Sequence, residues 1–160
     1  MILREYQRAD FETLCEIDRR CFEQAIAYSA SDMAAILGRR DSCTIVAQNT
    51  KGQVVGFIAA VRNGRRGHII TLDVLPRYRK RGLGKRLILR CEELLRQAGV
   101  EVVGLETAVG NRAAQALYQS LGYTRVKRLR RYYGNGEDAW VMKKEWNQDH
   151  VRSQASSGSR

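Results

Sequence analysis

The stretch Arg79-Lys80-Arg81-Gly82-Leu83-Gly84-Lys85 decides the fold. It joins an apolar run at 68–74 to a long amphipathic segment at 82–98, so the pattern predicts a turn between a strand and a helix. Glycine lets the backbone approach a ligand closely, and the first N–H groups of a helix lack partners within the helix. The helix dipole and four cationic side chains add positive charge, so this turn is a candidate anion site.

Two familiar phosphate-binding loops do not fit this turn. A Walker A loop needs glycine five residues before its Gly-Lys pair, and Arg79 stands there. A dinucleotide-binding fingerprint needs a third glycine where Leu87 stands, and it follows an opening strand rather than a later one. The spacing that remains is R-x-x-G-x-G.

Outward from the turn, strand-like and helix-like segments alternate along the chain. The order β-α-α-β-β-β-α-β-α-β-β predicts an α/β (α+β) fold with a mixed, mostly antiparallel sheet and helices on both faces. Asp10 is the expected N-cap of the first helix. The expected strands are 2–6, 43–48, 54–61, 68–74, 100–109, 123–132 and 139–144, and the expected helices start near 10 and at Ser31 and span 82–98 and 111–121.

The composition predicts one soluble globular domain at 1–146. Of the 160 residues, 44% are hydrophobic and 28% charged, which is enough for one core. No apolar run is long enough for a membrane span, and the first residues do not read as a secretory signal. The four cysteines form no C-x-x-C pair, which predicts buried free thiols in the cytoplasm. With only two histidines in the chain, we expect no zinc or other metal site. Residues 147–160 are polar and serine-rich, which predicts a disordered tail.

The net charge of +11 is concentrated in three runs, at 62–66, 77–81 and 125–131. A basic surface favours polyanionic partners such as nucleic acid, a ribosome or a phosphorylated cofactor. Charge alone leaves a non-catalytic, nucleic-acid-binding module open as one interpretation.

A second informative stretch is LETAVGNRAAQALYQSLGY at 105–123. Glu106 interrupts an apolar strand, where a buried carboxylate without a role is costly. The alternative is a side chain that points to solvent near a strand end. Tyr118 lies on the apolar face of its helix, so a core aromatic with a satisfied hydroxyl is the competing interpretation. Asn111 is placed to cap that helix.

Together, R-x-x-G-x-G and the 105–123 stretch resemble the signature regions of the GCN5-related N-acetyltransferases (GNAT). The resemblance covers 1 to about 145 and is strongest to the branch that acetylates protein N-termini, which includes ribosomal-protein-alanine acetyltransferases. It implies acetyl-CoA as co-substrate, no metal, Glu106 as general base and Tyr118 as general acid. The implied acetyl-CoA contacts are Leu72, Asp73, Val74, Arg79, Lys80, Arg81, Gly82, Leu83, Gly84, Lys85 and Asn111.

The resemblance also implies where the acceptor binds. In the branch, peptide selectivity lies in the loop between the first two helices and in the last hairpin, which gives Tyr28, Tyr132 and Tyr133 as candidate peptide contacts. Exposed strand aromatics that pack across the sheet are the alternative for the last two. This chain has Ala27-Tyr28-Ser29 where the branch often has Pro-Trp-Ser, so the accepted first residue stays open.

The chemistry favours an α-amine as acceptor. Near pH 7 an α-amine of pKa about 8 is roughly 10% neutral, whereas a lysine of pKa about 10.4 is roughly 0.04% neutral. We therefore expect an N-terminal protein acetyltransferase that works by direct attack in a ternary complex. Cys91 lies mid-helix on the core face, which disfavours an acetyl-enzyme. Lysine or a small polyamine is the alternative acceptor, a ribosomal protein is a candidate partner, and the oligomeric state stays open.

Overall fold

The structure is a computed structural model that describes residues 1–146, and the predicted tail at 147–160 lies outside the described residues. The element order along the chain is the predicted one, and the mixed α/β class is confirmed. The strands are β1 (Ile2–Glu5), β2 (Ser42–Gln48), β3 (Val54–Asn63), β4 (Arg66–Val74), β5 (Val102–Ala108), β6 (Thr124–Leu129) and β7 (Ala139–Glu145). The helices are α1 (Phe11–Cys21), α2 (Ala30–Leu37), α3 (Leu83–Gln97) and α4 (Arg112–Ser120), with 3-10 turns at Arg8–Asp10 and Pro76–Tyr78.

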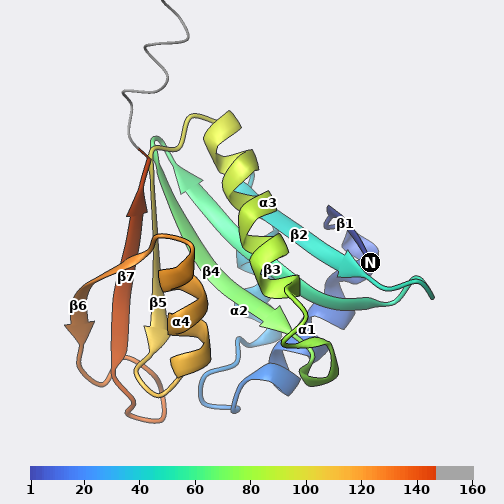
Figure 1. Ribbon diagram of the computed structural model, residues 1–160. Coiled ribbons are helices and arrows are strands. Elements are labelled where there is room, and N and C mark those ends of the chain that lie inside the picture. Colours follow the sequence, from blue (N-terminus) through green and yellow to red (C-terminus); the bar gives the residue numbers. More distant parts are fainter. Residues whose placement is uncertain (147–160) are drawn as a thin grey trace, which may run out of the picture.

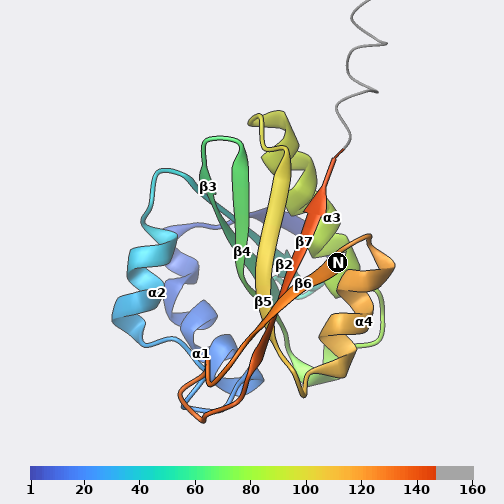
Figure 2. The same cartoon turned by 90° about the vertical axis from the view of Figure 1, so that its left-hand side faces the viewer.

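All seven strands form one sheet in the order β1-β2-β3-β4-β5-β7-β6. Neighbouring strands are antiparallel except β4 and β5, which are parallel. The last strand of the chain therefore lies between β5 and β6. Helices α3 and α4 cover one face of the sheet, and α1 and α2 cover the other (Figures 1 and 2).

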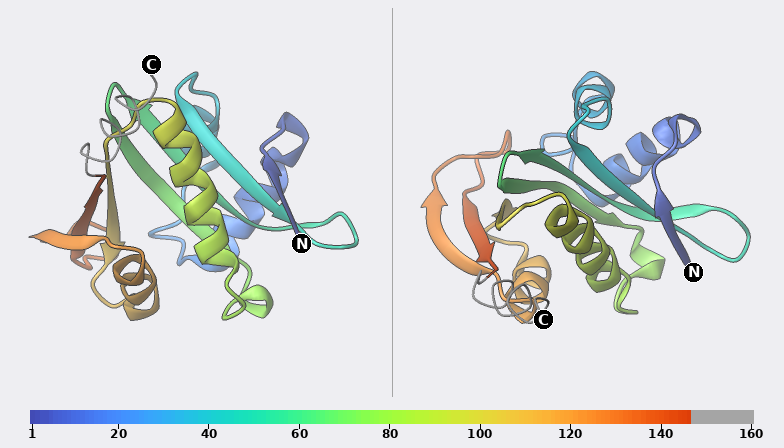
Figure 3. Two further views of the ribbon diagram at one scale, coloured as in Figure 1. Left: turned by 45° about the horizontal axis from the view of Figure 1, so that its top comes forward. Right: turned by 90° about the horizontal axis from the view of Figure 1, so that it is seen from above.

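The parallel pair β4–β5 is short, and this shapes the functional region. Only three positions pair, ending at His68 opposite Gly104, and beyond them the two strands separate. The opening between the strands is visible in Figure 1 and in the left view of Figure 3. A bulge at Ile70, where β4 has one residue more than β3, also changes which side chains face each layer.

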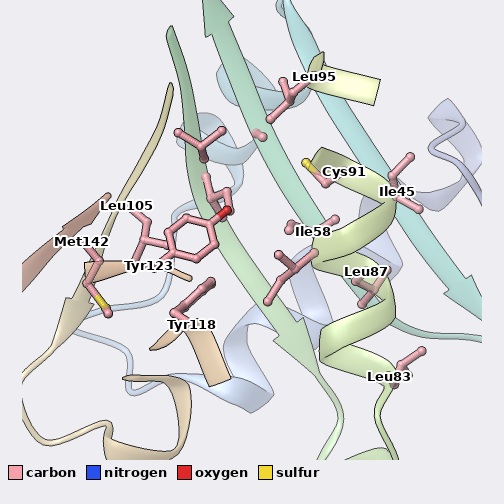
Figure 4. Close-up of a cluster of buried hydrophobic side chains, with 14 of the residues drawn as sticks. Ile45, Ile58, Leu83, Leu87, Cys91, Leu95, Leu105, Tyr118, Tyr123 and Met142 are labelled. Atoms are coloured by element: carbon pink, nitrogen blue, oxygen red, sulfur yellow. The ribbon is translucent and has the colours of Figure 1, made fainter. Parts of the chain in front are cut away.

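The sheet has a hydrophobic core on each face. On the α3–α4 side, the buried face of α3 packs on the sheet through Leu87, Cys91 and Leu95, as Figure 4 shows. On the other side, Leu14 of α1 and Met33 of α2 pack on Phe57 and its neighbours in the sheet. Full burial of each such side chain contributes roughly 1.5–3 kcal/mol to folding.

Some predicted details are wrong. The Asp10 carboxylate does not cap α1, because it pairs with Arg4 at 2.8 and 2.9 Å and accepts the Gln7 N–H. Helix α2 starts before Ser31, since Ser29 caps it by accepting the Asp32 N–H at 3.1 Å.

The last hairpin also differs from the prediction at its turn. Strand β6 ends at Leu129 rather than at 132, because the chain turns with positive φ at Arg131 and Gly136. Tyr132 and Tyr133 therefore lie in the β6–β7 loop, not on a strand.

The cysteine prediction holds in part. All four thiols are free, with Cys15 and Cys91 buried and Cys21 and Cys43 only partly so.

Candidate active site

A cleft of about 390 Å³ opens where β4 and β5 separate. Its walls come from the α1–α2 segment, β4, β5, α4 and the β6–β7 loop. Seven of the residues singled out in the sequence line it: Tyr28, Leu72, Glu106, Asn111, Tyr118, Tyr132 and Tyr133. The fold thus brings the predicted base, acid and peptide contacts to one place, from positions far apart in the chain.

Glu106 does not simply face solvent. Its Oε2 lies 2.6 Å from Nε2 of His68, and the two side chains are 21% and 39% exposed. His68 pairs with Gly104 across the parallel strands, so Glu106 lies two residues beyond, on the same face of β5. His68 is not among the candidate residues that the sequence indicated. A polar residue that interrupts an apolar strand was the available signal, as it was for Glu106.

Tyr118 is both a core residue and a cleft residue. It is 5% exposed, its ring meets Tyr123 edge-on with centroids 5.4 Å apart, and it lines the cleft. Burial raises the pKa of the Tyr118 phenol well above its usual 10, so the hydroxyl stays protonated at neutral pH. The Tyr118 ring is therefore packed in the core, and the same residue borders the cleft.

Two carboxylates meet beneath the cleft. Asp18 of α1 and Asp73 of β4 are each 1% exposed, and Asp18 Oδ1 and Asp73 Oδ2 have no hydrogen-bond partner among the described residues. Asp18 Oδ2 accepts the Tyr28 N–H at 2.7 Å, and the Thr71 hydroxyl donates to Asp73. Desolvation first, and then the Asp18 carboxyl, raise the pKa of Asp73 well above its usual range. A proton on Asp73 removes one of the two buried charges, which lowers the cost of placing the two carboxyl groups together.

The glycine turn lies at the start of α3, outside the cleft lining. Gly82 has φ of +79°, which favours glycine, and no side chain caps the helix. Arg79 Nε donates to the Val74 carbonyl at 2.7 Å. The Leu83 side chain is in the core, so only its backbone could meet a ligand. A Cβ at Gly84 would lie 3.1 Å from Leu117, which shows that this glycine also lets α3 pack against α4.

The α1–α2 segment and the β6–β7 loop meet at the rim of the cleft. A Cβ at Gly134 would lie 2.7 Å from the Ala25 carbonyl oxygen, so only glycine allows this approach. Asn135 also donates to Glu23 at 3.3 Å across the same contact. Tyr132 and Tyr133 stack edge-on beside it, with ring centroids 4.9 Å apart. Burial raises the pKa of Tyr28 to about 12.

Residues 11–123 of the chain match the model of the acetyltransferase (GNAT) family. The chain belongs to this family. Among related sequences, the N-alpha-acetyltransferase MAK3 of Arabidopsis thaliana is 42% identical over 97 residues, which is 58% of this chain. The chain spans only about half of that relative, 51% of its length.

Solved GNAT structures share the fold. The ribosomal-protein-S18-alanine N-acetyltransferase of Escherichia coli is 26% identical with a TM-score of 0.80, over 90% of this chain and 92% of that one. A chain of the NatC complex bound to Gag peptide and CoA is 25% identical with a TM-score of 0.78, over 91% and 98%. The predicted family and fold are therefore confirmed.

Two absences hold for residues 1–146, the part of the chain that the structure describes. None of the helices there is long and apolar enough to cross a membrane. Within the same residues, no group of three or more His, Cys, Asp or Glu side chains could hold a metal ion.

Proposed function

We propose that this protein transfers the acetyl group of acetyl-CoA to the α-amine of a protein N-terminus, by direct attack in a ternary complex. The observation that carries this proposal is the cleft itself. The Glu106–His68 pair and the Tyr118 phenol line or border one opening between β4 and β5, beside the aromatic rim formed by Tyr132 and Tyr133. A proton acceptor and a proton donor beside one opening are the groups that acetyl transfer to an amine needs.

The start of α3 suits the pyrophosphate of acetyl-CoA. The first N–H groups of α3 lack a side-chain cap, and Gly82 leaves open space where a Cβ would be. Arg79, Lys80, Arg81 and Lys85 add positive charge around this helix end. Asn111 caps α4 by accepting the Ala114 N–H at 3.2 Å, and its position on the cleft lets it contact the co-substrate as well.

Glu106 and Tyr118 then have opposite roles in proton transfer. Glu106, hydrogen-bonded to His68, accepts the proton that the α-ammonium must lose before its nitrogen attacks the thioester carbonyl. A C–N bond forms and the C–S bond breaks. Tyr118 donates its proton to the departing thiolate. A backbone N–H of the Leu72–Val74 segment polarises the carbonyl, as the family resemblance implies.

The alternatives have less support. At pH 7 a lysine or polyamine acceptor has a much smaller neutral fraction than an α-amine, so Glu106 would have to deprotonate a much weaker acid. A purely nucleic-acid-binding module would not need the cleft or its acid–base pair. The similarity to a ribosomal-protein acetyltransferase makes a ribosomal protein a candidate acceptor. Four free thiols suit the reducing cytoplasm, which is the compartment we propose.

Incubation with isotope-labelled acetyl-CoA and a mixture of N-terminally free peptides, read by mass spectrometry, tests the function. We expect peptides to gain acetyl groups and CoA to be released in equal amounts. Tyr132→Ala/Tyr133→Ala should weaken peptide use and leave acetyl-CoA binding unchanged. If a folded variant loses peptide use and acetyl-CoA binding equally, Tyr132 and Tyr133 are not peptide contacts.

A further inference from the structure

The α4–β6 half of the molecule carries an unusual excess of positive charge. Between Glu106 and Glu137 the chain has no acidic residue at all. Six cations lie in that interval, all of them exposed: Arg112, Arg125, Lys127, Arg128, Arg130 and Arg131. The proposed acetyl transfer uses none of them, so this surface has no role yet.

A β-bulge gathers two of these arginines on one face. The register of β6 against β7 shifts between Arg125 and Lys127, so that Arg125 lies opposite Met142 and Arg128 opposite Trp140. Residues two apart on a strand share a face, so Trp140 and Met142 put both arginines on the α4 side of the sheet. Their guanidinium carbons lie 4.9 and 5.6 Å from the centre of the Trp140 ring. Lys127, opposite Val141, lies on the other side.

A groove of about 380 Å³ runs between this face and the outside of α4. Arg112, Gln119, Arg125 and Trp140 line it, and Figure 2 shows α4 beside β6. Arg125 is held in place, because its Nη2 donates to Gln115 Oε1 at 2.8 Å. The Arg112 side chain forms no ion pair or hydrogen bond within residues 1–146, whereas Arg128 Nε lies 2.7 Å from Asp138 Oδ2.

The groove and the cleft lie on different faces of α4. Residues 111, 114 and 118 line the cleft, whereas 112, 115 and 119 line the groove. One residue turns a helix by about 100°, so the two sites are separate. A ligand in the groove leaves the acetyl-transfer cleft open.

We propose that this groove binds the phosphate backbone of a single-stranded nucleic acid, with Arg112 and Arg125 as the phosphate contacts. Arginine predominates among the six cations, and its planar guanidinium bonds phosphate through two N–H groups at once. Trp140 and two glutamines adjoin Arg112 and Arg125 in the groove lining, so an aromatic ring lies beside the positive charges. A narrow basic groove is how single strands are held.

The proposal is tested with fluorescently labelled RNA and DNA strands of about 12 nucleotides. Their affinity for the protein is measured by anisotropy over a range of salt concentrations. Single strands lose log affinity with a slope of about 0.7 per phosphate contact, so Arg112→Glu/Arg125→Glu should lower the slope by about 1.4 and weaken binding at least about tenfold. The matched control Arg62→Glu/Arg66→Glu has the same net charge change on the β3–β4 hairpin, and should stay within about threefold. Parallel RNA and DNA arms identify the preferred strand.

A second readout reports on the groove directly. In Trp146→Phe, Trp140 is the one remaining tryptophan, and its fluorescence should change when the strand binds. Both charge variants should acetylate free peptides like the wild type, which verifies that they are folded. Equal weakening by the two double variants, or a silent Trp140 at saturation, overturns the proposal. So does displacement of the strand by polyglutamate at an equal charge concentration, which would assign the groove to acidic proteins.

Discussion

Nε2 of His68 lies 2.6 Å from Oε2 of Glu106, across the parallel strands β4 and β5 and just past their last paired residues. The contact holds the Glu106 carboxylate at the point where the two strands separate. An amine that enters the cleft therefore meets a fixed proton acceptor, which is the basis of the predictions on catalysis.

Glu106→Gln should lower kcat by about 10²–10⁴-fold at pH 7, because general acid–base groups contribute that much. Raising the pH deprotonates the amine without assistance, so activity should recover partly toward pH 9. Steady-state kinetics of both proteins from pH 6 to 9 measure this recovery. If the Gln variant shows no recovery, Glu106 orients the substrate and another group accepts the proton.

Tyr118→Phe should lower kcat within the same range but without recovery at high pH, since the missing proton is needed later, at the thiolate. The ring and its edge-on contact with Tyr123 remain, so thermal stability should change little. Paired measurements of kcat and Tm provide the test. A wild-type kcat in the Phe variant would make Tyr118 a packing residue only.

Gly82→Ala should raise the KM for acetyl-CoA, because a methyl group would stand where the pyrophosphate is expected. Gly64→Ala is the matched control, since both glycines have positive φ and open space around the added Cβ. Each change should cost about 1–2 kcal/mol of stability. Equal KM values for the two variants would contradict a phosphate site at this turn. Gly84→Val is a poorer test, since its side chain would press on Leu117.

The Asp18–Asp73 pair makes stability depend on pH. Since the folded state binds the Asp73 proton more tightly than the unfolded chain, its stabilisation is complete below the unfolded pKa of about 3.9 and is lost as pH rises through the raised folded pKa. Asp73→Asn keeps a donor toward Asp18 at every pH. Its unfolding free energy should therefore fall less than that of the wild type as pH rises from 4 to 9. Asp32→Asn, at an exposed carboxylate, serves as the control, and a wild-type pH profile in Asp73→Asn would argue against a raised pKa of Asp73.

The element order and the glycine turn could be predicted because they depend on local patterns. Apolar residues repeat at strand or helix spacing, and glycines end the segments. Glu106 stood out because a carboxylate interrupts an apolar strand. Tyr118 and the rim tyrosines came from the family resemblance rather than from spacing, and the fold brings them to the same cleft.

What the sequence did not predict depends on tertiary contacts. The insertion of β7 between β5 and β6 is a choice of partner strand, which periodicity does not encode. The role of His68 depends on Glu106, which lies 38 positions away along the chain. The role of Asp18 depends on Asp73, which lies 55 positions away. Asp10 had the right place for an N-cap, but Arg4 offers its carboxylate a stronger, charged partner.

The most direct test of the central claim uses one peptide with a free α-amine and an internal lysine, incubated with the protein and labelled acetyl-CoA. Fragmentation mass spectrometry then locates the acetyl group. We predict one acetyl group on the α-amine, and none on a matched peptide whose α-amine is blocked. Acetylation of lysine in both peptides, or no transfer to any amine, would contradict the account.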